Sequence, residues 1–169
     1  VVQAGADAVK DLDVHKVGVI STCFTASTHC YPDLIGKAAP DKVVISHGCP
    51  DLANVVERNV GRPEGQALID ADVQKNLEGL VRDEQIECCV LGCTHYPLLT
   101  DIIREIMGPE VSLVNAGAES VHTLHDALAR RQLLAPEGTG QALLCTSDRP
   151  EGFGQMARRF LQEEPTAPV

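Results

Sequence analysis

The chain has 169 residues, of which 44% are hydrophobic and 22% are charged, so it can bury the core of one domain, or of one domain and part of another. Its net charge of −10 disfavours nucleic acids and anionic membrane surfaces as partners, because basic side chains supply most of the attraction to both. No apolar run is long enough to cross a membrane, and no basic segment precedes an apolar one at the start, so we expect a cytoplasmic protein. Because the first residue is Val1 rather than methionine, we also expect the sequence to be a fragment.

Short apolar runs alternate along the chain with segments of helical spacing. The runs lack polar alternation, which predicts buried strands at 16–20, 42–46, 88–91, 111–114 and 142–146. Helices are predicted over 1–13, 26–35, 52–60, 68–81, 97–107, 117–128 and 153–161, followed by a frayed tail at 163–169. Strands that alternate with helices in this way predict an α/β fold with a doubly wound parallel sheet.

Polar residues follow each of the first three predicted strands. The first strand leads to Thr22 and Thr25, the second to Cys49, and the third to Cys93, Thr94 and His95. The carboxyl ends of parallel strands meet at one edge of the sheet, where open α/β folds bind their ligands. We therefore expect these three turns to converge on one crevice.

Cys93 is the candidate for chemistry within this crevice. It follows Gly92 at the end of a strand, and Pro97 is suited to the first turn of the helix that follows. The partial positive charge at a helix N-terminus lowers the pKa of a nearby thiol, and His95 can adjust it further. The pattern indicates an activated thiol, although perturbed groups also occur in purely structural networks.

A zinc site is the competing interpretation of the cysteines. Either Cys89, Cys93 and His95, or Cys23, His29 and Cys30, could supply ligands. Structural zinc sites, however, favour two closely spaced ligand pairs, and no second pair is present. Cys88 and Cys89 would also point to opposite faces of a strand, so at most one of them could join a site. We therefore predict no metal.

Three segments of the chain carry a family resemblance. They are the strand and turn from Val17 to Thr25, the segment from Cys49-Pro50 to Glu57, and the run Gly-Cys-Thr-His-Tyr-Pro-Leu-Leu from Gly92 to Leu99. In this order and spacing they resemble the glutamate racemases, within the aspartate/glutamate racemase superfamily. Two later segments, 113–119 and 144–148, resemble the closing strands of that family, so the similarity covers nearly the whole chain.

The resemblance implies an enzyme that interconverts L- and D-glutamate by proton transfer between two cysteines, without pyridoxal phosphate or metal. Two groups on opposite faces are a natural solution, because inversion removes a proton from one face and delivers one to the other. By resemblance, Cys93 is the base for L-glutamate, His95 assists its proton transfer, and Glu57 orients or polarises His95. Thr94 would bind the substrate, and Thr22 and Thr25 would help to frame the site. The family role is the supply of D-glutamate for peptidoglycan, and the resemblance allows a homodimer.

The resemblance also implies two α/β lobes with the substrate between them. Residues 1–112 would form most of the second lobe, and residues 113–169 would cross back to complete the first. The family's Asp-Ser-Gly loop and its Cys-Asn-Thr motif, which carries the second catalytic cysteine, are not present. Cys23 lies at the position of the threonine turn, so we interpret it as non-catalytic. We therefore predict that this chain alone is inactive.

Departures from the family pattern leave other functions open. The segment after Cys49-Pro50 has Ala53-Asn54 where a second proline is usual, and Asn115 replaces a more common acidic residue. One alternative is a racemase of aspartate or another amino acid, although the Tyr-Pro-Leu-Leu continuation favours glutamate. The other is a non-catalytic binding protein that keeps the fold.

Overall fold

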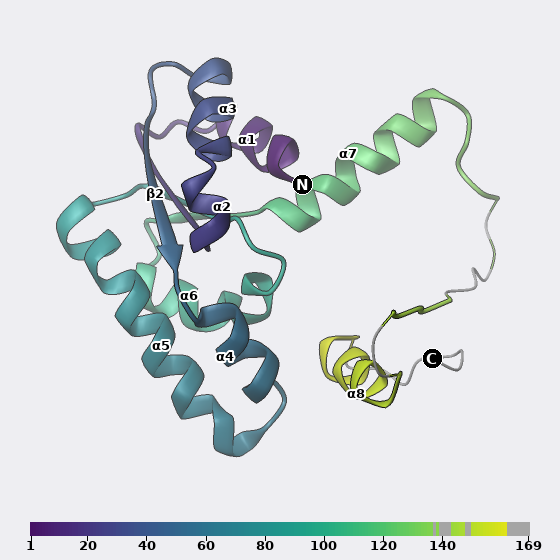
Figure 1. Cartoon of the computed structure of the whole chain (residues 1–169). Helices are drawn as coiled ribbons and strands as arrows, with labels where there is room; N and C mark the ends of the chain where they lie inside the picture. Colours follow the sequence, from purple (N-terminus) through teal and green to yellow (C-terminus); the bar gives the residue numbers. More distant parts are fainter. Residues whose placement is uncertain (137, 139–142, 148–149, 162–169) are drawn as a thin grey trace.

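A computed structural model describes residues 1–136, 138, 143–147 and 150–161 (Figure 1). At its centre is a four-stranded parallel sheet with the strand order β2-β1-β3-β4. The strands are β1 (Lys16–Thr22), β2 (Val43–Cys49), β3 (Cys88–Leu91) and β4 (Ser112–Asn115). This arrangement confirms the predicted α/β class and the parallel sheet. The order reverses between β1 and β3, and an open α/β sheet binds ligands at such a reversal.

Helices cover both faces of the sheet, as a doubly wound fold requires (Figure 1). One face packs against α1 (Val2–Lys10), α3 (Cys30–Ala38) and the start of α7 (Ala116–Arg130). The other packs against α4 (Leu52–Asn59), α5 (Gln66–Gly79) and α6 (Thr100–Met107). The shorter elements are α2 (Cys23–Ser27), a 3₁₀ turn at Pro63–Gly65, a π-helical turn at Leu80–Glu84 and a 3₁₀ turn at Tyr96–Leu99.

Side-chain alternation along β3 divides the core into two layers. Cys88 and Val90 lie in the layer of α1 and α3, whereas Cys89 and Leu91 lie in the layer of α4, α5 and α6. All four side chains are buried. The prediction that Cys88 and Cys89 point to opposite faces is therefore confirmed.

Two predicted strands are longer in the structure than their apolar runs. β1 continues through Thr22 and β2 through Cys49, because Ser21 pairs with Gly48 and Thr22 pairs with Cys49. Backbone pairing between neighbours extends a strand whatever its side chains are, so composition alone placed these ends too early. The helix predicted through Ile35 is also interrupted, since His29 has a φ of 55° between α2 and α3.

The prediction of a fifth strand at 142–146 is wrong for the residues that the structure describes. Residues 143–147 belong to no helix or strand, and the side chain of Leu143 is 76% exposed. An apolar run forms a strand only where a neighbouring strand offers free backbone groups, and residues 143–146 form no ladder with β2 or β4. Residue 142 and the predicted tail at 163–169 lie outside the described residues.

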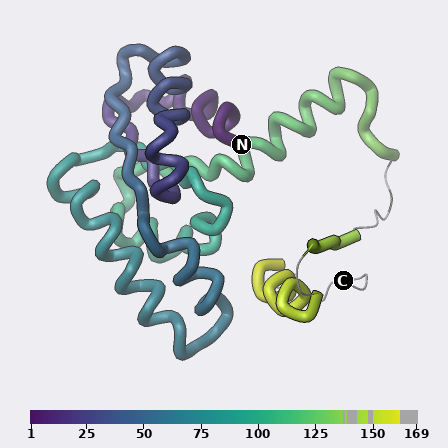
Figure 2. The backbone as a smooth tube through the Cα atoms, viewed as in Figure 1, coloured from purple at the N-terminus to yellow at the C-terminus, as the bar shows by residue number. Residues whose placement is uncertain are grey.

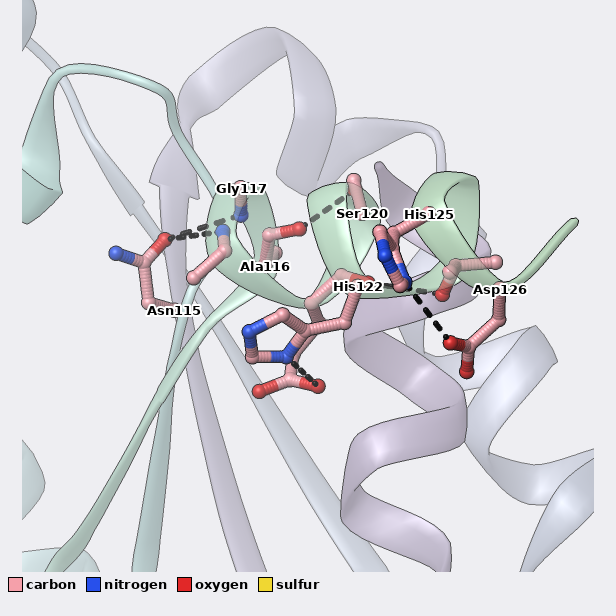
Figure 3. A network of polar contacts seen from close by, with 10 residues as sticks. Asn115, Ala116, Gly117, Ser120, His122, His125 and Asp126 are labelled. Atoms are coloured by element: carbon pink, nitrogen blue, oxygen red, sulfur yellow. Dashed lines mark hydrogen bonds and ion pairs between the residues drawn. The ribbon is translucent and has the colours of Figure 1, made fainter. Parts of the chain in front are cut away.

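α7 begins beside the sheet and then extends away from it (Figure 2). Asn115 caps its first turn, since Oδ1 accepts hydrogen bonds from the backbone N–H groups of Gly117 and Ala118 at 3.0 and 3.1 Å (Figure 3). His122 and His125 lie exposed on the same helix, each beside a carboxylate of that helix. The last described helix, α8 (Pro150–Leu161), is separate from α7 in the view of Figure 1.

Candidate active site

The candidate site lies where the carboxyl end of β3 leads into the turn of Cys93. The N–H of Gly92 donates to the carbonyl oxygen of Ile20 at 2.8 Å, which ties this turn to β1. A β-carbon on Gly92 would lie 3.0 Å from that same oxygen and 3.0 Å from Cε2 of Tyr31. No larger residue fits at this position without displacement, so the glycine allows the close approach that places Cys93 beyond the strand.

Three predicted residues are connected in a line. Sγ of Cys93 lies 3.6 Å from Nδ1 of His95, and Nε2 of His95 lies 2.9 Å from Oε1 of Glu57. Cys93 and His95 come from the turn after β3, whereas Glu57 comes from α4 after β2. The side chain of His95 is 23% exposed and that of Glu57 is 45% exposed. The line therefore runs from a half-buried thiol to a carboxylate at the surface.

The contacts of His95 assign a role to each imidazole nitrogen when Glu57 is ionised. An ionised carboxylate can only accept hydrogen bonds, so Nε2 of His95 carries the hydrogen that is donated to Glu57. In a neutral imidazole, Nδ1 is then the acceptor, and it faces the thiol of Cys93. His95 is consequently oriented to take a proton from Cys93 or to return one.

Burial raises the pKa of the Cys93 thiol, and the nearby charge of Glu57 raises it further. Backbone N–H groups of His95 and Tyr96 act in the opposite direction. We expected the helix N-terminus to lower this pKa, and that prediction is wrong for the net shift. The reason is that the turn withdraws the thiol from water, which penalises the thiolate more than the N–H groups stabilise it. Burial at the turn thus favours the protonated thiol of Cys93.

Thr22 and Thr25 form a pair of their own at the end of β1. Their Oγ1 atoms are 3.1 Å apart, and Oγ1 of Thr22 also accepts from the N–H of Thr25 at 3.2 Å, which caps α2. Because β1 and β3 are adjacent and parallel, this pair lies in the turn next to that of Cys93. Thr94 is exposed, between Cys93 and His95 in the chain. The structure thus gives the threonine pair a local capping role and leaves Thr94 open to a ligand.

The other cysteines at this end of the sheet differ in accessibility. Cys49 is buried, and burial raises its pKa to about 12, so it stays protonated at neutral pH. Cys23 is exposed. Among the side chains that the structure describes, no three His, Cys, Asp or Glu residues are grouped as a metal site requires. Cys93, by contrast, lies with its Sγ 3.6 Å from an imidazole nitrogen, Nδ1 of His95.

One contact of the site was not foreseen from the sequence. The ring of Phe160, on α8, meets the ring of His95 edge to face, with centroids 5.6 Å apart and an interplanar angle of 85°. The apolar spacing of 153–161 predicted a helix with one apolar face, and it gave no sign of which element that face contacts.

Within the described residues, no helix has the length and apolar character needed to cross a bilayer.

Comparison with known proteins gives a consistent set of relatives. The chain matches no family model. It is 33% identical over 167 residues to a glutamate racemase of Streptococcus agalactiae, covering 97% of this chain and 61% of the relative. It is 39% identical over 151 residues to a glutamate racemase of Corynebacterium glutamicum, covering 86% of this chain and 53% of the relative.

Solved structures give the same result. A glutamate racemase from Bacillus anthracis superposes with a TM-score of 0.87 at 30% identity, covering 96% of this chain and 60% of that one. A glutamate racemase from Francisella tularensis, solved in complex with D-glutamate, superposes with a TM-score of 0.82 at 27% identity and covers 96% of this chain and 59% of that one. The chain therefore spans about 60% of the length of the structures it matches.

Proposed function

Since this chain belongs to the glutamate racemase family, we propose that Cys93 exchanges the α-proton of glutamate on one face of the substrate. The observation that carries the proposal is the line of contacts from Sγ of Cys93 to Nδ1 of His95 at 3.6 Å and from Nε2 of His95 to Glu57 at 2.9 Å. A thiol with a raised pKa that lies beside an oriented imidazole suits a group that must both remove and deliver protons.

In the proposed reaction Cys93 is the base for L-glutamate. His95 accepts the thiol proton at Nδ1, and the thiolate then takes the α-proton from one face of the substrate. Glu57 stabilises the imidazolium through Nε2, because a carboxylate favours the charged form of its partner. In the reverse direction the thiol of Cys93 delivers its proton and L-glutamate forms. Thr94 and the Thr22–Thr25 pair would hold the substrate at the same edge of the sheet.

Inversion also needs a group on the opposite face of the α-carbon. The chain spans about three fifths of the relatives' length, and we place the opposing cysteine in the part that this chain does not match. Within that scheme residues 1–112 form one lobe and residues 113–169 contribute to the other. The exposed apolar side chains of α7, Val121 and Leu124, support this division, because contiguous apolar surface is usually covered by a partner element. The D-glutamate formed would serve peptidoglycan synthesis.

The test uses the full open reading frame that contains residues 1–169, assayed for racemisation and for exchange of the α-proton in D₂O. We expect interconversion of L- and D-glutamate, and a loss of at least ~100-fold with Cys93→Ala, because a positioned general base contributes at least that much. Cys23→Ala is the matched control, since this exposed thiol lies at the same edge of the sheet. Full activity of Cys93→Ala would contradict the proposal.

Two further arms separate the alternatives. Turnover of aspartate in preference to glutamate would indicate the related racemase, whereas binding of glutamate without exchange at any pH would indicate a binding protein. We also expect residues 1–169 alone to racemise neither enantiomer, because one face of the substrate lacks its proton donor. Measurable exchange of both enantiomers by the 169-residue chain would contradict the two-lobe scheme.

A further inference from the structure

The helix α8 reaches the candidate site through one aromatic side chain. Phe160 packs against the core layer of α4, α5 and α6, and its ring meets the His95 ring edge to face at a centroid distance of 5.6 Å. The neighbouring Arg159 lies beside the end of α4, since a β-carbon on Gly61 would be 3.7 Å from Cγ of Arg159. α8 therefore contacts the two segments that carry Glu57 and His95.

The contact matters because the hydrogen bonds alone hold His95 loosely. Nδ1 is 3.6 Å from a sulfur atom, which is a weak acceptor and donor, and Nε2 bonds a carboxylate that is 45% exposed. Water competes for such a carboxylate. A rotation of the imidazole about its bond to the β-carbon would turn both nitrogens away from their partners. An edge-to-face aromatic neighbour favours one orientation of the ring plane and so opposes that rotation.

The surroundings of the pair agree with this role. A hollow of about 320 Å³ lies between α8 and the His95–Glu57 hydrogen bond. Apart from Glu57 and His95, the side chains that line it are apolar, and they include Phe153, Met156 and Phe160. α8 thus forms an apolar wall beside the His95–Glu57 pair.

We propose that Phe160 is a positioning residue for proton transfer at Cys93. Its ring keeps Nδ1 of His95 directed at Sγ of Cys93. This inference rests on the proposed function of Cys93 for its kinetic consequences. Its structural part, the orientation and tautomer of His95, can be measured without any activity.

The structural part is tested on the 169-residue chain labelled with ¹⁵N at histidine. The chemical shifts of the His95 nitrogens report which nitrogen carries the hydrogen. We expect a single Nε2–H tautomer in the wild type and in Phe160→Tyr, which keeps the ring, and a mixture of tautomers in Phe160→Ala. Phe153→Ala is the matched control, because it removes the same side chain from the same wall of the hollow. Unchanged shifts in Phe160→Ala would overturn the proposal.

The kinetic part uses the full open reading frame. We expect Phe160→Ala to lower kcat by about 10- to 100-fold, as small displacements of catalytic groups do. Enantiomers have equal free energies, so kcat/KM must fall equally in both directions. The deuterium isotope effects on kcat/KM, however, should change in opposite directions. With α-deuterated L-glutamate the isotope effect should rise, because Cys93 breaks the bond to the α-hydrogen and that step becomes slower. With α-deuterated D-glutamate the isotope effect should fall, because the opposing group breaks that bond and this step no longer limits the rate.

The outcomes distinguish this inference from the function on which it rests. A merely structural role for Phe160 would lower the amount of active protein and leave both isotope effects unchanged, which would overturn the proposal. If the wild type shows no exchange while Phe160→Ala still alters the tautomer of His95, the proposed function fails and the positioning of His95 by Phe160 stands. If the wild type is active and Phe160→Ala behaves like Phe153→Ala in both measurements, the positioning role fails and the proposed function stands.

Discussion

Residues 1–115 and residues 116–161 both contain helices with apolar faces, but the two regions bury those faces to different degrees. In the first region, the sheet body, α6 has eight residues and buries Ile103 and Met107. In the second, α7 has fifteen residues and buries only Ala116. Val121 and Leu124 of α7 are 64% and 58% exposed. Apolar spacing therefore predicts that a helix forms, whereas burial depends on what lies opposite.

The two regions also contribute differently to the candidate site. The sheet body supplies Cys93, His95 and Glu57, which are held by strands and helices packed on both faces of a sheet. The C-terminal region supplies Phe160, which approaches the same imidazole from outside. We expect the body to set the geometry of the proposed reacting groups and α8 to adjust one of them. The following predictions test that division.

The largest expected effect is a fall in the unfolding free energy of the sheet body at alkaline pH. Burial raises the pKa of Tyr31 to about 12, of Cys49 to about 12 and of Cys88 to about 11, and it also raises the pKa of Cys89 and Tyr96. All of these groups belong to residues 1–115. Above the ordinary thiol range, near pH 8.5, the unfolded chain loses protons that the folded chain keeps, so stability falls as pH rises.

Each group that titrates only in the unfolded state lowers the unfolding free energy by about 1.4 kcal/mol per pH unit. Urea unfolding is measured by circular dichroism at a series of pH values. We expect the urea midpoint to be steady below pH 8 and to fall steeply between pH 9 and 11. Cys88→Ala should make this fall shallower, because it removes one of the titrating thiols. A midpoint that is independent of pH up to 11 would contradict the assigned burial.

The next effect compares one leucine from each region. Leu77 of α5 is fully buried, and Leu77→Ala should lower the unfolding free energy by about 2–5 kcal/mol through lost burial and a residual cavity. Leu124→Ala on α7 makes the same change at an exposed position and should cost less than about 0.5 kcal/mol in the 169-residue chain.

The same leucine pair tests the two-lobe scheme. In the full open reading frame, Leu124→Ala should become destabilising if another segment covers α7. Urea unfolding of both variants in both backgrounds gives the answer. Equal costs for Leu124→Ala in the two backgrounds would indicate that α7 stays uncovered.

A third prediction concerns the glycine that places Cys93. Gly92→Ala should lower the unfolding free energy by about 1–3 kcal/mol, because its β-carbon would meet the Ile20 carbonyl oxygen and the Tyr31 ring at 3.0 Å. The racemase activity of the protein encoded by the full open reading frame should also fall, since Cys93 is the next residue. Gly36→Ala is the control: nothing lies within 4 Å of that position, and it is inside α3.

For the control we expect a gain of about 0.5–1 kcal/mol, because alanine is favoured over glycine in a helix interior. Thermal unfolding distinguishes the two glycines. A Gly92→Ala variant that is as stable and as active as Gly36→Ala would show that the turn of Cys93 tolerates a shift.

The smallest effect compares two helix caps. Thr22→Ala removes the cap of α2 in the sheet body, and Asn115→Ala removes the cap of α7 (Figure 3). Each loss costs about 1 kcal/mol of local helix stability. Hydrogen exchange should show faster opening at Thr25 in the first variant and at Gly117 and Ala118 in the second.

The consequences of the two caps for the whole protein should differ. Thr22→Ala is expected to lower substrate binding as well, whereas Thr22→Ser should restore it because the hydroxyl is kept. Asn115→Ala should leave the exchange rates of β1 and β3 unchanged. Equal global destabilisation by both caps would mean that α7 is as tightly coupled to the core as α2.

Much of the fold could be predicted from the sequence because local patterns are strong in the sheet body. The apolar run at 88–91 coincides with β3, and Gly61 follows the predicted end of the helix that carries Glu57. The ends of β1 and β2 could not be predicted, since Thr22 and Cys49 are strand residues only through their pairing with each other. Residues 143–146 show the converse, because their apolar pattern is present and none of the four described strands pairs with them.

The candidate site was predictable in its members and not in its geometry. The motif around Cys93 resembles a known family, and that resemblance pointed to His95 and Glu57. The separation of 38 residues between His95 and Glu57 says nothing about their 2.9 Å contact, which depends on α4 packing beside the turn after β3. Phe160 could not have been found, because an apolar helical face does not specify its neighbour.

The sequence by itself determined the alternation of four strands with helices in the sheet body, the parallel α/β class and the family motif, since each follows from local periodicity or from residues adjacent in the chain. Tertiary structure decided which groups meet and what that does to them. The net rise in the pKa of Cys93 is the clearest case, because the sequence indicated a helix terminus that lowers this pKa. Burial, which depends on every element packed around the turn, has the larger effect and reverses the sign.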